Sequence, residues 1–433
     1  MSVFYHSVTL DEEKCKGCTN CIKRCPTQAI RVRDGKAHIR SSHCIDCGEC
    51  IRLCPHHAKR AIFDDISRLN EFEYKIALPP PSLYGQFNNL NDIDYVLTGL
   101  LKLGFDSIYE VSKSAEIISD ATRRLMKTGK LRTPIISSAC PAIVRLIRVR
   151  YPALCDHVLP LLSPMQVAAR DAKVIAHAKT GLPPEKIGVF FLTPCPAKIT
   201  DVRQPIGIEH SWVDATLSMT DVYPRLVECM NQINTPQQIA KSGIIGVSWA
   251  NSGGEASALI REKYLAADGI ENVISVLENL EDERLCELDF IELGACIGGC
   301  VGGTLTVENP YVAKARIHQL RKYMPVSLNR LDDYTQIENL RWNSTLEYEN
   351  VMQLSDDFSQ ALTMMANIER IAEILPDLDC GACGAPTCRT LAEDIVTGMA
   401  RPNDCLFVLR NEAISAGISL SQDPRDKAKK EDL

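Results

Sequence analysis

The sequence lacks the long apolar segments that membrane proteins need. In its 433 residues, no uninterrupted apolar stretch reaches the roughly 18 residues that a transmembrane helix requires. The first residues, MSVFYHSVTLDEEK, also lack the apolar core of a secretory signal peptide. We therefore expect a cytoplasmic protein with no membrane partner.

The sequence also lacks a basic surface pattern. Its 55 acidic residues outnumber its 48 lysines and arginines, which gives a formal net charge of −7, and the basic residues form no stripe interleaved with aromatics. This balance argues against nucleic acid as a partner. With 45% hydrophobic residues the chain can bury a sizeable core, and its length predicts about three domains.

Cysteine, in contrast, is abundant. The chain has 19 cysteines, and because a reducing compartment disfavours disulfides, metal ligation is the favoured role. Two stretches of the chain repeat the pattern C-x2-C-x2-C-x3-C-P. In such paired runs, three close thiolates bind one 4Fe-4S cluster and the fourth binds the neighbouring cluster. We therefore expect one cluster on Cys15, Cys18, Cys21 and Cys54, and a second on Cys44, Cys47, Cys50 and Cys25.

Zinc is the alternative metal for these runs, but two complete runs that each end in Cys-Pro favour iron-sulfur clusters. His43, His56 and His57 lie beside the cysteines, and we expect them at the surface because both clusters already have four thiolates. The segment AIRVRDGKAHI predicts a hairpin that turns at Asp34-Gly35. These features predict a small α+β ferredoxin-like domain over residues 1–62.

The long middle segment, residues 63–344, alternates short apolar runs with helical periodicity. This pattern indicates an α/β domain with mainly parallel sheets. Three strand-like runs, 134–136, 189–192 and 290–293, are each followed by a cysteine motif. Because strand ends converge in the crevice of such a sheet, we expect the three motifs to form one site. A helix capped by Asp92 should bury an apolar face made of Ile93, Val96, Leu97, Leu100 and Leu101.

The three motifs read SSACP, TPCPAK and ELGACIGGC. They resemble the signature loops T-S-C-C-P, M-P-C-x-x-K and E-x-M-x-C-x-x-G-C of iron-iron (FeFe) hydrogenases. The resemblance implies a catalytic domain of two lobes that binds an H-cluster. Lys198 would donate a hydrogen bond to a cyanide ligand, and Cys300 would bridge to a two-iron subsite with CO, CN and a dithiolate. The cubane of the H-cluster would be bound by Cys140, Cys195, Cys296 and Cys300.

Several positions depart from the family pattern. Ala139 stands where a cysteine would pass a proton to the dithiolate, and Thr193 and Gly294 replace methionines. Asp120 and Arg123 occupy the positions of two glutamates of the proton chain. These losses predict slow turnover and resemble a divergent branch of the family to which a sensory role is ascribed.

A substitute proton route needs other acids. Glu292, at the start of the third motif, and Glu255, after a Ser-Gly-Gly segment, are the candidates. The alternative for either carboxylate is a salt-bridged surface group. Four glycines of the third motif, Gly298, Gly299, Gly302 and Gly303, are expected where backbone approaches the cofactor closely.

The C-terminal part has a second type of cysteine motif. Residues 345–375 predict a connecting helix, with Leu354, Phe358, Leu362, Met365, Ile368 and Ile371 on one buried face. Residues 376–410 then predict a small helical domain that resembles a 4Fe-4S module, with zinc as the alternative metal. The tail, 411–433, is charged and expected to be disordered after Gln422. The expected ligands are Cys380, Cys383, Cys388 and Cys405, whereas Cys155, Cys229 and Cys286 are expected to be small buried hydrophobes.

Three functions are compatible with these motifs. The first is a slow hydrogenase that interconverts H2, protons and electrons. The second is a sensor that uses the same site and signals through a partner. The third is an iron-sulfur assembly protein of the nuclear-prelamin-recognition type without a two-iron subsite. The first two would require maturation proteins and a redox partner, such as a ferredoxin or a signalling protein, and Lys198 favours them because a cyanide donor has little purpose without cyanide.

Overall fold

The computed structural model describes residues 5–351 and 353–416, and the chain divides into two compact units. The first unit holds the described residues up to Thr9, with Cys44–Arg52 and Lys59–Glu349. The second unit holds Leu10–His43, Leu53–Ala58 and the described residues from Asn350. The domain boundaries expected from the sequence stay predictions. None of the described helices is long and apolar enough to cross a membrane.

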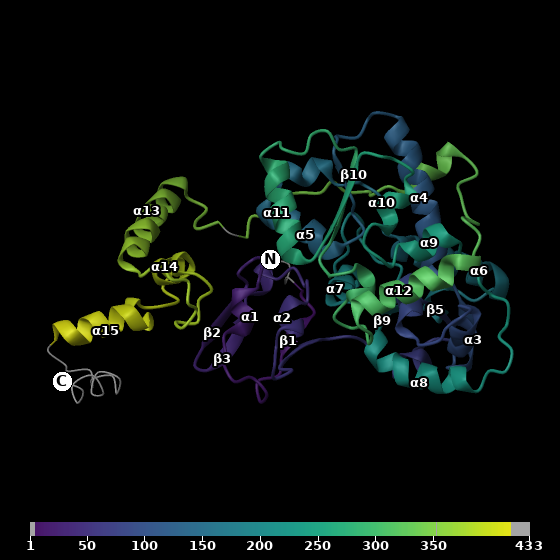
Figure 1. The fold of residues 1–433 in the computed structure, drawn as a ribbon, viewed down its shortest axis with the longest axis horizontal. Helices are drawn as coiled ribbons and strands as arrows, with labels where there is room; N and C mark the ends of the chain where they lie inside the picture. The colour runs from purple at the N-terminus through teal and green to yellow at the C-terminus, as the bar shows by residue number, and fades with distance from the viewer. Residues whose placement is uncertain (1–4, 352, 417–433) are drawn as a thin grey trace, which may run out of the picture. The chain divides into compact units, whose positions relative to one another are not determined.

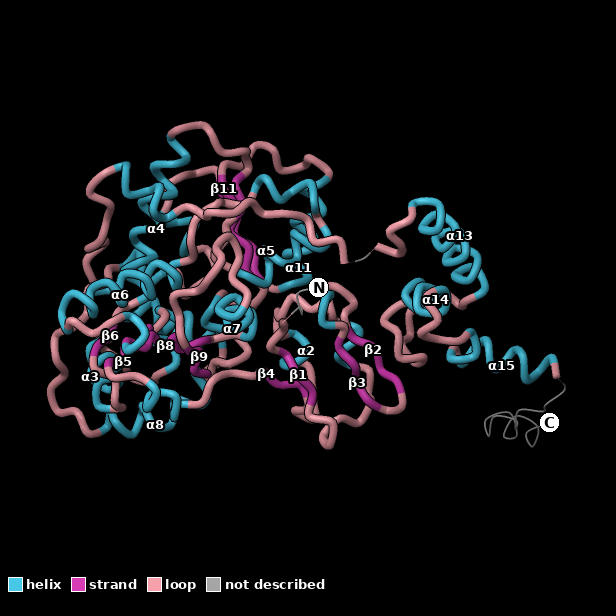
Figure 2. Tube along the Cα trace, turned by 180° about the vertical axis from the view of Figure 1, so that it is seen from behind, coloured by secondary structure: helices cyan, strands magenta, loops and turns pink. Residues whose placement is uncertain are grey.

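The first unit contains two parallel sheets, which confirms the expected α/β class (Figure 2). Both sheets need crossover connections, because all their neighbouring strands pair in parallel. The four-stranded sheet has the order β6 (Ser107–Ile108), β5 (Tyr74–Leu78), β8 (Ile187–Thr193) and β9 (Ala215–Ser218). The three-stranded sheet has the order β10 (Tyr264–Asp268), β11 (Phe290–Gly294) and β7 (Ile135–Ile136).

Strand β8 shows why strands of the four-stranded sheet appear in the sequence as uninterrupted apolar runs. All seven of its residues are buried, because helices cover both faces of the sheet. Phe190 packs in the core cluster formed with α3 (Asp94–Lys102) and α8 (Met219–Asn231), which are labelled in Figure 1. Phe191 points to the opposite face and packs with α6 (Pro164–Thr180).

Helix α3 begins slightly later than the sequence predicts. Oδ1 of Asp92 accepts a hydrogen bond of 2.9 Å from the backbone N–H of Asp94, so Asp92 supports the first turn from outside the helix. Of the five residues expected on the buried face, only Leu101 is half-exposed.

The remaining helices of the first unit surround the two sheets. Near the N-terminal end of this unit, β1 (Val8–Leu10) pairs with β4 (Lys59–Ala61). The helices are α2 (Glu49–Arg52), α4 (Val111–Lys127), α5 (Pro141–Arg150), α7 (Pro196–Arg203), α9 (Ile244–Ser248), α10 (Gly254–Ala258), α11 (Ile270–Glu281) and α12 (Pro310–Leu320).

The second unit contains the predicted hairpin. Strands β2 (Ile30–Arg33) and β3 (Lys36–Ile39) pair in antiparallel register after α1 (Asn20–Lys23). Asp34 and Gly35 at the turn have φ values of 50° and 71°. Two successive positive φ angles are typical of a type I′ turn, which is why Asp-Gly occurs there.

The C-terminal helices of the second unit correct one expectation. Helix α13 (Phe358–Ile374) starts later than the predicted connecting helix, and Ile368 is its only buried residue among those described. Phe358 is 78% exposed because only the later turns of the helix pack on α14 (Cys388–Val396). Helix α15 (Leu406–Ser415) follows, and the tail predicted to be disordered after Gln422 lies outside the described residues.

The three cysteines outside the motifs do not behave alike. Cys155 is buried as expected, but Cys229 is half-exposed and Cys286 is exposed. Cys286 lies in the loop before β11, where its Sγ contacts the backbone O of Glu283 at 3.0 Å. The prediction of small buried hydrophobes is therefore confirmed for Cys155 and wrong for Cys286, whereas Cys229 is only partly buried.

Candidate metal centre

Local sequence positions the cysteines of the first two motifs at the starts of helices. Cys140 precedes α5 and Cys195 precedes α7, and each helix begins with the proline that follows the cysteine. Proline suits the first helical position because its fixed φ is compatible with a helix and no N–H is needed there. Each Cys-Pro pair therefore directs a thiol toward the end of the strand that precedes it.

All three motifs follow the carboxyl ends of strands, but the strands belong to different sheets. The first motif follows β7 and the third follows β11, which are neighbours in the three-stranded sheet. The second motif follows β8 in the four-stranded sheet. The expected single crevice is thus formed between two sheets of the first unit.

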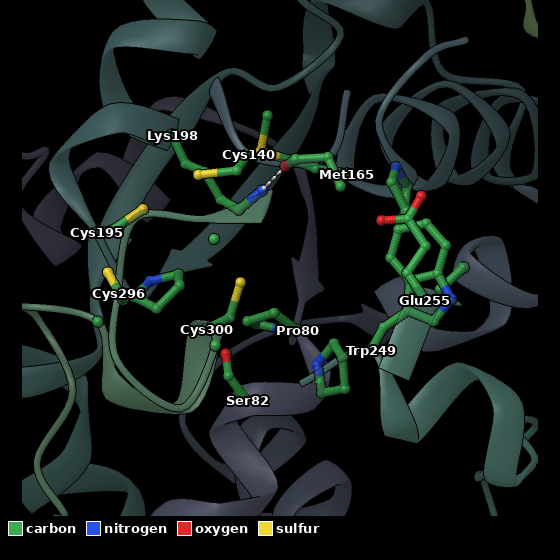
Figure 3. Close-up of a pocket in the computed structure, with 18 of the residues that line it drawn as sticks. Pro80, Ser82, Cys140, Met165, Cys195, Lys198, Trp249, Glu255, Cys296 and Cys300 are labelled. Atoms are coloured by element: carbon green, nitrogen blue, oxygen red, sulfur yellow. Dashed lines mark hydrogen bonds between the residues drawn. The ribbon is translucent and has the colours of Figure 1, made fainter. Parts of the chain in front are cut away.

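The motifs meet around one cavity (Figure 3). Lys198 projects into it from α7, and its Nζ donates a hydrogen bond of 3.3 Å to the backbone O of Ala139. Glu255 and Glu292 line the same cavity. The structure therefore brings together the catalytic residues expected from the sequence. The four thiols that line it are those of Cys140, Cys195, Cys296 and Cys300.

Burial favours the protonated form of three of these thiols, those of Cys195, Cys296 and Cys300, in the absence of metal. It raises the pKa of Cys195 to about 12 and also raises the pKa of Cys296 and Cys300. Burial would lower the pKa of Lys198, but the nearby thiolates, Cys300 first, outweigh it and raise that pKa. Metal binding at this site must therefore release protons, and the Lys198 cation favours the anionic thiolate state.

Two observations show that the cavity suits an iron-sulfur group with polar ligands. Four thiols are a soft donor set, which is typical of iron-sulfur ligation. Ser82 Oγ and Asn251 Oδ1 also line the cavity, and both are buried without a hydrogen-bond partner among the described residues. In Figure 3, Ser82 lies on the side of the cavity that holds Cys300. Buried polar atoms without partners are rare, so a polar ligand there would satisfy them.

Two glycines of the third motif, Gly299 and Gly303, line the cavity as expected, and both also lie very close to neighbouring loops. Gly299 has φ 90°, and a Cβ there would lie 2.4 Å from the backbone N of Ser252. A Cβ on Gly303 would lie 2.3 Å from the backbone O of Pro194. The close approach is thus between neighbouring protein loops, which lets the third motif pack beside the second.

Glu255 and Glu292 form a carboxylate pair in the cavity, of which Glu255 is buried and Glu292 is half-buried. Ser137 Oγ donates to Oε2 of Glu255 at 2.5 Å, and the backbone N–H groups of Ala256 and Gly253 donate to Glu292 at 2.8 and 3.0 Å. Burial and the charge of Glu292 raise the pKa of Glu255 to about 8. Burial raises the pKa of Glu292 to about 7 although its hydrogen bonds oppose the shift. No described residue forms an ion pair with either carboxylate, unlike the salt-bridged alternative.

The two positions expected to replace glutamates of the family's proton chain, Asp120 and Arg123, form an ion pair. Asp120 contacts Arg123 at 3.2 Å and Arg124 at 2.9 Å. Neither Asp120 nor Arg123 lines the cavity. Thr193, expected to stand in place of a methionine, donates from Oγ1 to the backbone O of Cys195 at 2.8 Å. Thr193 is therefore a positioning residue for the second motif.

The same backbone-to-thiol hydrogen bond occurs in both ferredoxin-like cysteine runs, which is consistent with one run being a repeat of the other. The backbone N–H of Ala29 donates to Sγ of Cys25, and that of Ala58 donates to Sγ of Cys54, both at 3.2 Å. The same four-residue spacing produces the same turn in both runs. How the eight cysteines divide between two clusters stays a prediction.

The histidines beside these runs differ from one another. His56 and His57 are exposed, as predicted. His43 is half-buried, and burial with the nearby Arg40 lowers its pKa to about 4. The expectation of a surface position is wrong for His43 because its loop folds against the arginines of the hairpin.

The C-terminal cysteines also meet at one small pocket of the second unit. This pocket lies between the loop before α14 and the start of α15. The sequence motif therefore corresponds to a local cluster of thiols suited to one 4Fe-4S cluster. The four thiols lining it are those of Cys380, Cys383, Cys388 and Cys405.

Sequence reasoning missed several residues of the main cavity. Ser82 follows the carboxyl end of β5, as the cysteine motifs follow other strands, and this position was a signal that was not used. Asn251, Met165 and Trp249 come from segments without any motif. Only the tertiary fold brings them to the cavity.

Comparison with known families agrees with the geometry. The family described as "Iron only hydrogenase large subunit, C-terminal domain" matches residues 75–264 and 255–304, which is more than half of the chain. A 4Fe-4S dicluster domain matches residues 7–55, and a putative Fe-S cluster family matches residues 375–407. The chain is an iron-sulfur protein that belongs to the iron-only, or FeFe, hydrogenase family.

Curated relatives fall into two groups. The chain is 26% identical to the "Periplasmic [Fe] hydrogenase large subunit" of Nitratidesulfovibrio vulgaris over 69% of this chain and 86% of the relative. It is 26% identical to the "NADP-reducing hydrogenase subunit HndD" of Solidesulfovibrio fructosivorans, over 47% and 44% of the two chains. It is also 26% identical to the "Cytosolic Fe-S cluster assembly factor nar1" of Aspergillus fumigatus, over 30% and 22%.

A variant of the [FeFe]-hydrogenase HydA1 from Chlamydomonas reinhardtii matches with a TM-score of 0.48 and 14% identity, over 65% of this chain and 95% of that chain.

Proposed function

We propose that this protein interconverts H2, protons and electrons at an H-cluster held in the main cavity. The observation that carries the proposal is the convergence of four thiols and the Lys198 ammonium on one cavity. Cys140, Cys195, Cys296 and Cys300 would hold the cubane, and Cys300 would also bridge to the two-iron subsite with CO, CN and dithiolate ligands. When bound, this cofactor supplies the activation of hydrogen.

The chain's own residues would orient the ligands and handle the protons. Lys198 would donate to a cyanide, and Ser82 would offer a second donor from a hydroxyl that has no partner among the described residues. Ala139 has a methyl group, which neither donates nor accepts a proton. Glu255 and Glu292 would therefore hold and pass the proton, since their pKa values lie near neutral pH.

We further propose that turnover is slow and serves H2 or redox sensing. Loss of a positioned proton donor at Ala139 is expected to lower the rate by ~10²–10⁴-fold relative to family members with a cysteine there. Electrons would leave through two ferredoxin-type clusters and one C-terminal 4Fe-4S cluster. Their acceptor would be a redox partner such as a ferredoxin or a signalling protein, in the cytoplasm, and maturation proteins would install the two-iron subsite.

Infrared spectroscopy of matured protein, with a hydrogen assay, tests this function. Bands from metal-bound CO and CN, with measurable H2 oxidation or proton reduction, are expected. Anaerobic iron analysis should give about sixteen iron atoms from four 4Fe-4S clusters besides the two-iron subsite, and air should destroy the clusters. Iron near about eight atoms per chain would mean that only the ferredoxin-type pair binds.

The second candidate is an iron-sulfur assembly protein of the nuclear-prelamin-recognition type. The observation that favours it is the similarity to the nar1 assembly factors. A complete set of cubanes without CO or CN bands and without hydrogen activity after maturation would support this candidate and exclude the first.

A further inference from the structure

A buried ion cluster joins two distant parts of the second unit. Asp394 on α14 is 1% exposed, and its carboxylate accepts hydrogen bonds from Arg31 at 2.6 and 3.1 Å. Arg33 contacts the same carboxylate at 3.1 Å and Arg40 at 2.6 Å. The three arginines come from the β2–β3 hairpin and the residue after it. A buried carboxylate needs such partners, so Asp394 holds the hairpin and α14 together.

Backbone contacts extend this joint to the cysteine loop of the C-terminal module. The N–H of Val32 donates to the backbone O of Gly384 at 2.8 Å. Arg33 Nη1 donates to the backbone O of Cys383 at 2.5 Å. A Cβ on Gly384, which has φ 80°, would lie 1.8 Å from the O of Val32, so only glycine permits this approach.

A second set of contacts lies beside the first ferredoxin-type run. A Cβ on Gly381 would lie 3.3 Å from Ile22 and 3.4 Å from Lys23, so the loop between Cys380 and Cys383 is in van der Waals range of α1. Helix α1 carries Cys21, an expected cluster ligand. The cysteine loop of the C-terminal module therefore lies against the segment that would hold a ferredoxin-type cluster.

We propose that the C-terminal module is a fixed electron relay, docked on the ferredoxin-like hairpin through Asp394 and its three arginines. The inference rests on the proposed function for the presence of the clusters, but the docking itself does not. Electron transfer between clusters weakens steeply with distance, so a module held against α1 exchanges electrons with the cluster beside Cys21. The module is thereby the exit, or entry, of the electron path.

Hydrogen exchange measured by mass spectrometry on the full chain tests the docking. The amide of Val32 is the reporter, because its partner, the O of Gly384, belongs to the C-terminal module. In Asp394→Asn we expect exchange at Val32 to accelerate by about 10²-fold or more, since breaking a buried ion pair is strongly destabilising. The amide of Arg40, which donates to Ala29 within the ferredoxin-like part at 2.7 Å, should keep its protection.

Two further variants separate docking from folding. Glu369→Gln removes an exposed charge on α13 that pairs with Arg389 at 3.3 Å, and it should leave exchange at Val32 unchanged. The double variant Arg33→Gln/Arg40→Gln alters only the hairpin side, so the C-terminal fold stays intact while exchange at Val32 accelerates. Unchanged exchange at Val32 in both Asp394→Asn and the double variant would overturn the docking.

EPR of the reduced holoprotein tests the relay separately. We expect magnetic coupling between the C-terminal cluster and a ferredoxin-type cluster in the unmodified protein, and loss of that coupling in the double variant with its iron content unchanged. Coupling that persists in the double variant would contradict the relay.

If Cys388→Ser leaves iron content and spectrum unchanged, the C-terminal cluster itself is absent, which refutes the proposed cofactor set and not the docking.

Discussion

Ser137 Oγ donates a hydrogen bond of 2.5 Å to Oε2 of Glu255, and this contact links the first cysteine motif to α10. The backbone N–H of Ala139 donates back to Ser137 Oγ at 3.1 Å. A chain of hydrogen bonds therefore runs from the carboxylate pair to the position that lacks the family's cysteine. This arrangement makes the carboxylate pair testable as a proton route.

Glu255→Gln and Glu292→Gln should each lower hydrogen turnover by ~10²–10⁴-fold, because glutamine keeps the size but loses the exchangeable acid. Each variant should also remove the contribution of its own group to the pH profile of the rate, near pH 8 for Glu255 and near pH 7 for Glu292. Steady-state assays across this range measure both effects, with exposed Glu287→Gln as control. If neither variant changes the rate or its pH profile, protons reach the subsite through water alone.

The same variants should change how stability depends on pH. The folded pKa of Glu255, about 8, lies above the ordinary value of 4.5, so the folded state holds a proton that the unfolded state releases. The contribution of Glu255 to the free energy of unfolding is therefore largest below about pH 4.5 and decreases as the pH rises toward about 8. Glu255→Gln should flatten that decrease in denaturant unfolding curves.

Ala139→Cys alone should recover much less than the ~10²–10⁴-fold that a positioned donor contributes. The reason is that Asp120, which stands where the proton chain would continue, is held by Arg123 and Arg124. Hydrogen evolution by matured protein measures the effect. A full gain of rate would show that the thiol alone was missing and that the ion pair presents no obstacle.

Lys198→Met should shift the cyanide bands in the infrared spectrum, because the ammonium donor is removed from the cavity. Iron affinity of the site should also fall by ~10–100-fold, as is common when a supporting group of a metal centre is lost. Lys173→Met, in an ion pair outside the cavity with Asp214 at 2.9 Å, provides the control. Cyanide bands at unchanged frequencies would contradict a role for Lys198 in binding that ligand.

Cys300→Ser should abolish assembly of the two-iron subsite while both ferredoxin-type clusters survive, because they share no expected ligand with it. Infrared spectra report the subsite and EPR reports the clusters. Loss of every cluster at once would indicate global misfolding, and an intact set of CO and CN bands would show that Cys300 is not the bridge.

Asp46→Asn should destabilise the first unit by about 3–5 kcal/mol, because it breaks a buried charge network. Asp46 accepts hydrogen bonds from the N–H of Ser7 at 3.1 Å and from Thr200 at 2.7 Å, and Arg145 lies 3.9 Å away. Denaturant unfolding of the metal-free protein measures the change. The exposed pair of Asp156 and Arg132, tested by Asp156→Asn, should cost at most about 1 kcal/mol. Equal costs for the two variants would contradict the network.

Local features of the fold and site were predictable from the sequence. The cysteine-proline pairs Cys140-Pro141 and Cys195-Pro196, each of which begins a helix, are features of adjacent residues. The Asp34-Gly35 turn with its positive φ angles is another such feature. The length and composition of the strand before each motif also follow from a few consecutive residues. These features were predicted because a short segment suffices to define each of them.

Tertiary structure alone decided the rest. The sequence by itself determined which cysteines group into motifs, but not that the motifs come from two sheets, nor that Glu255 and Glu292 share one cavity. Nor does it indicate that Arg31 meets Asp394, 363 residues away. Side chains become buried, and charges come close to one another, only when distant segments of the chain pack together. The sequence around a charged residue therefore does not reveal whether water or another charge will surround it.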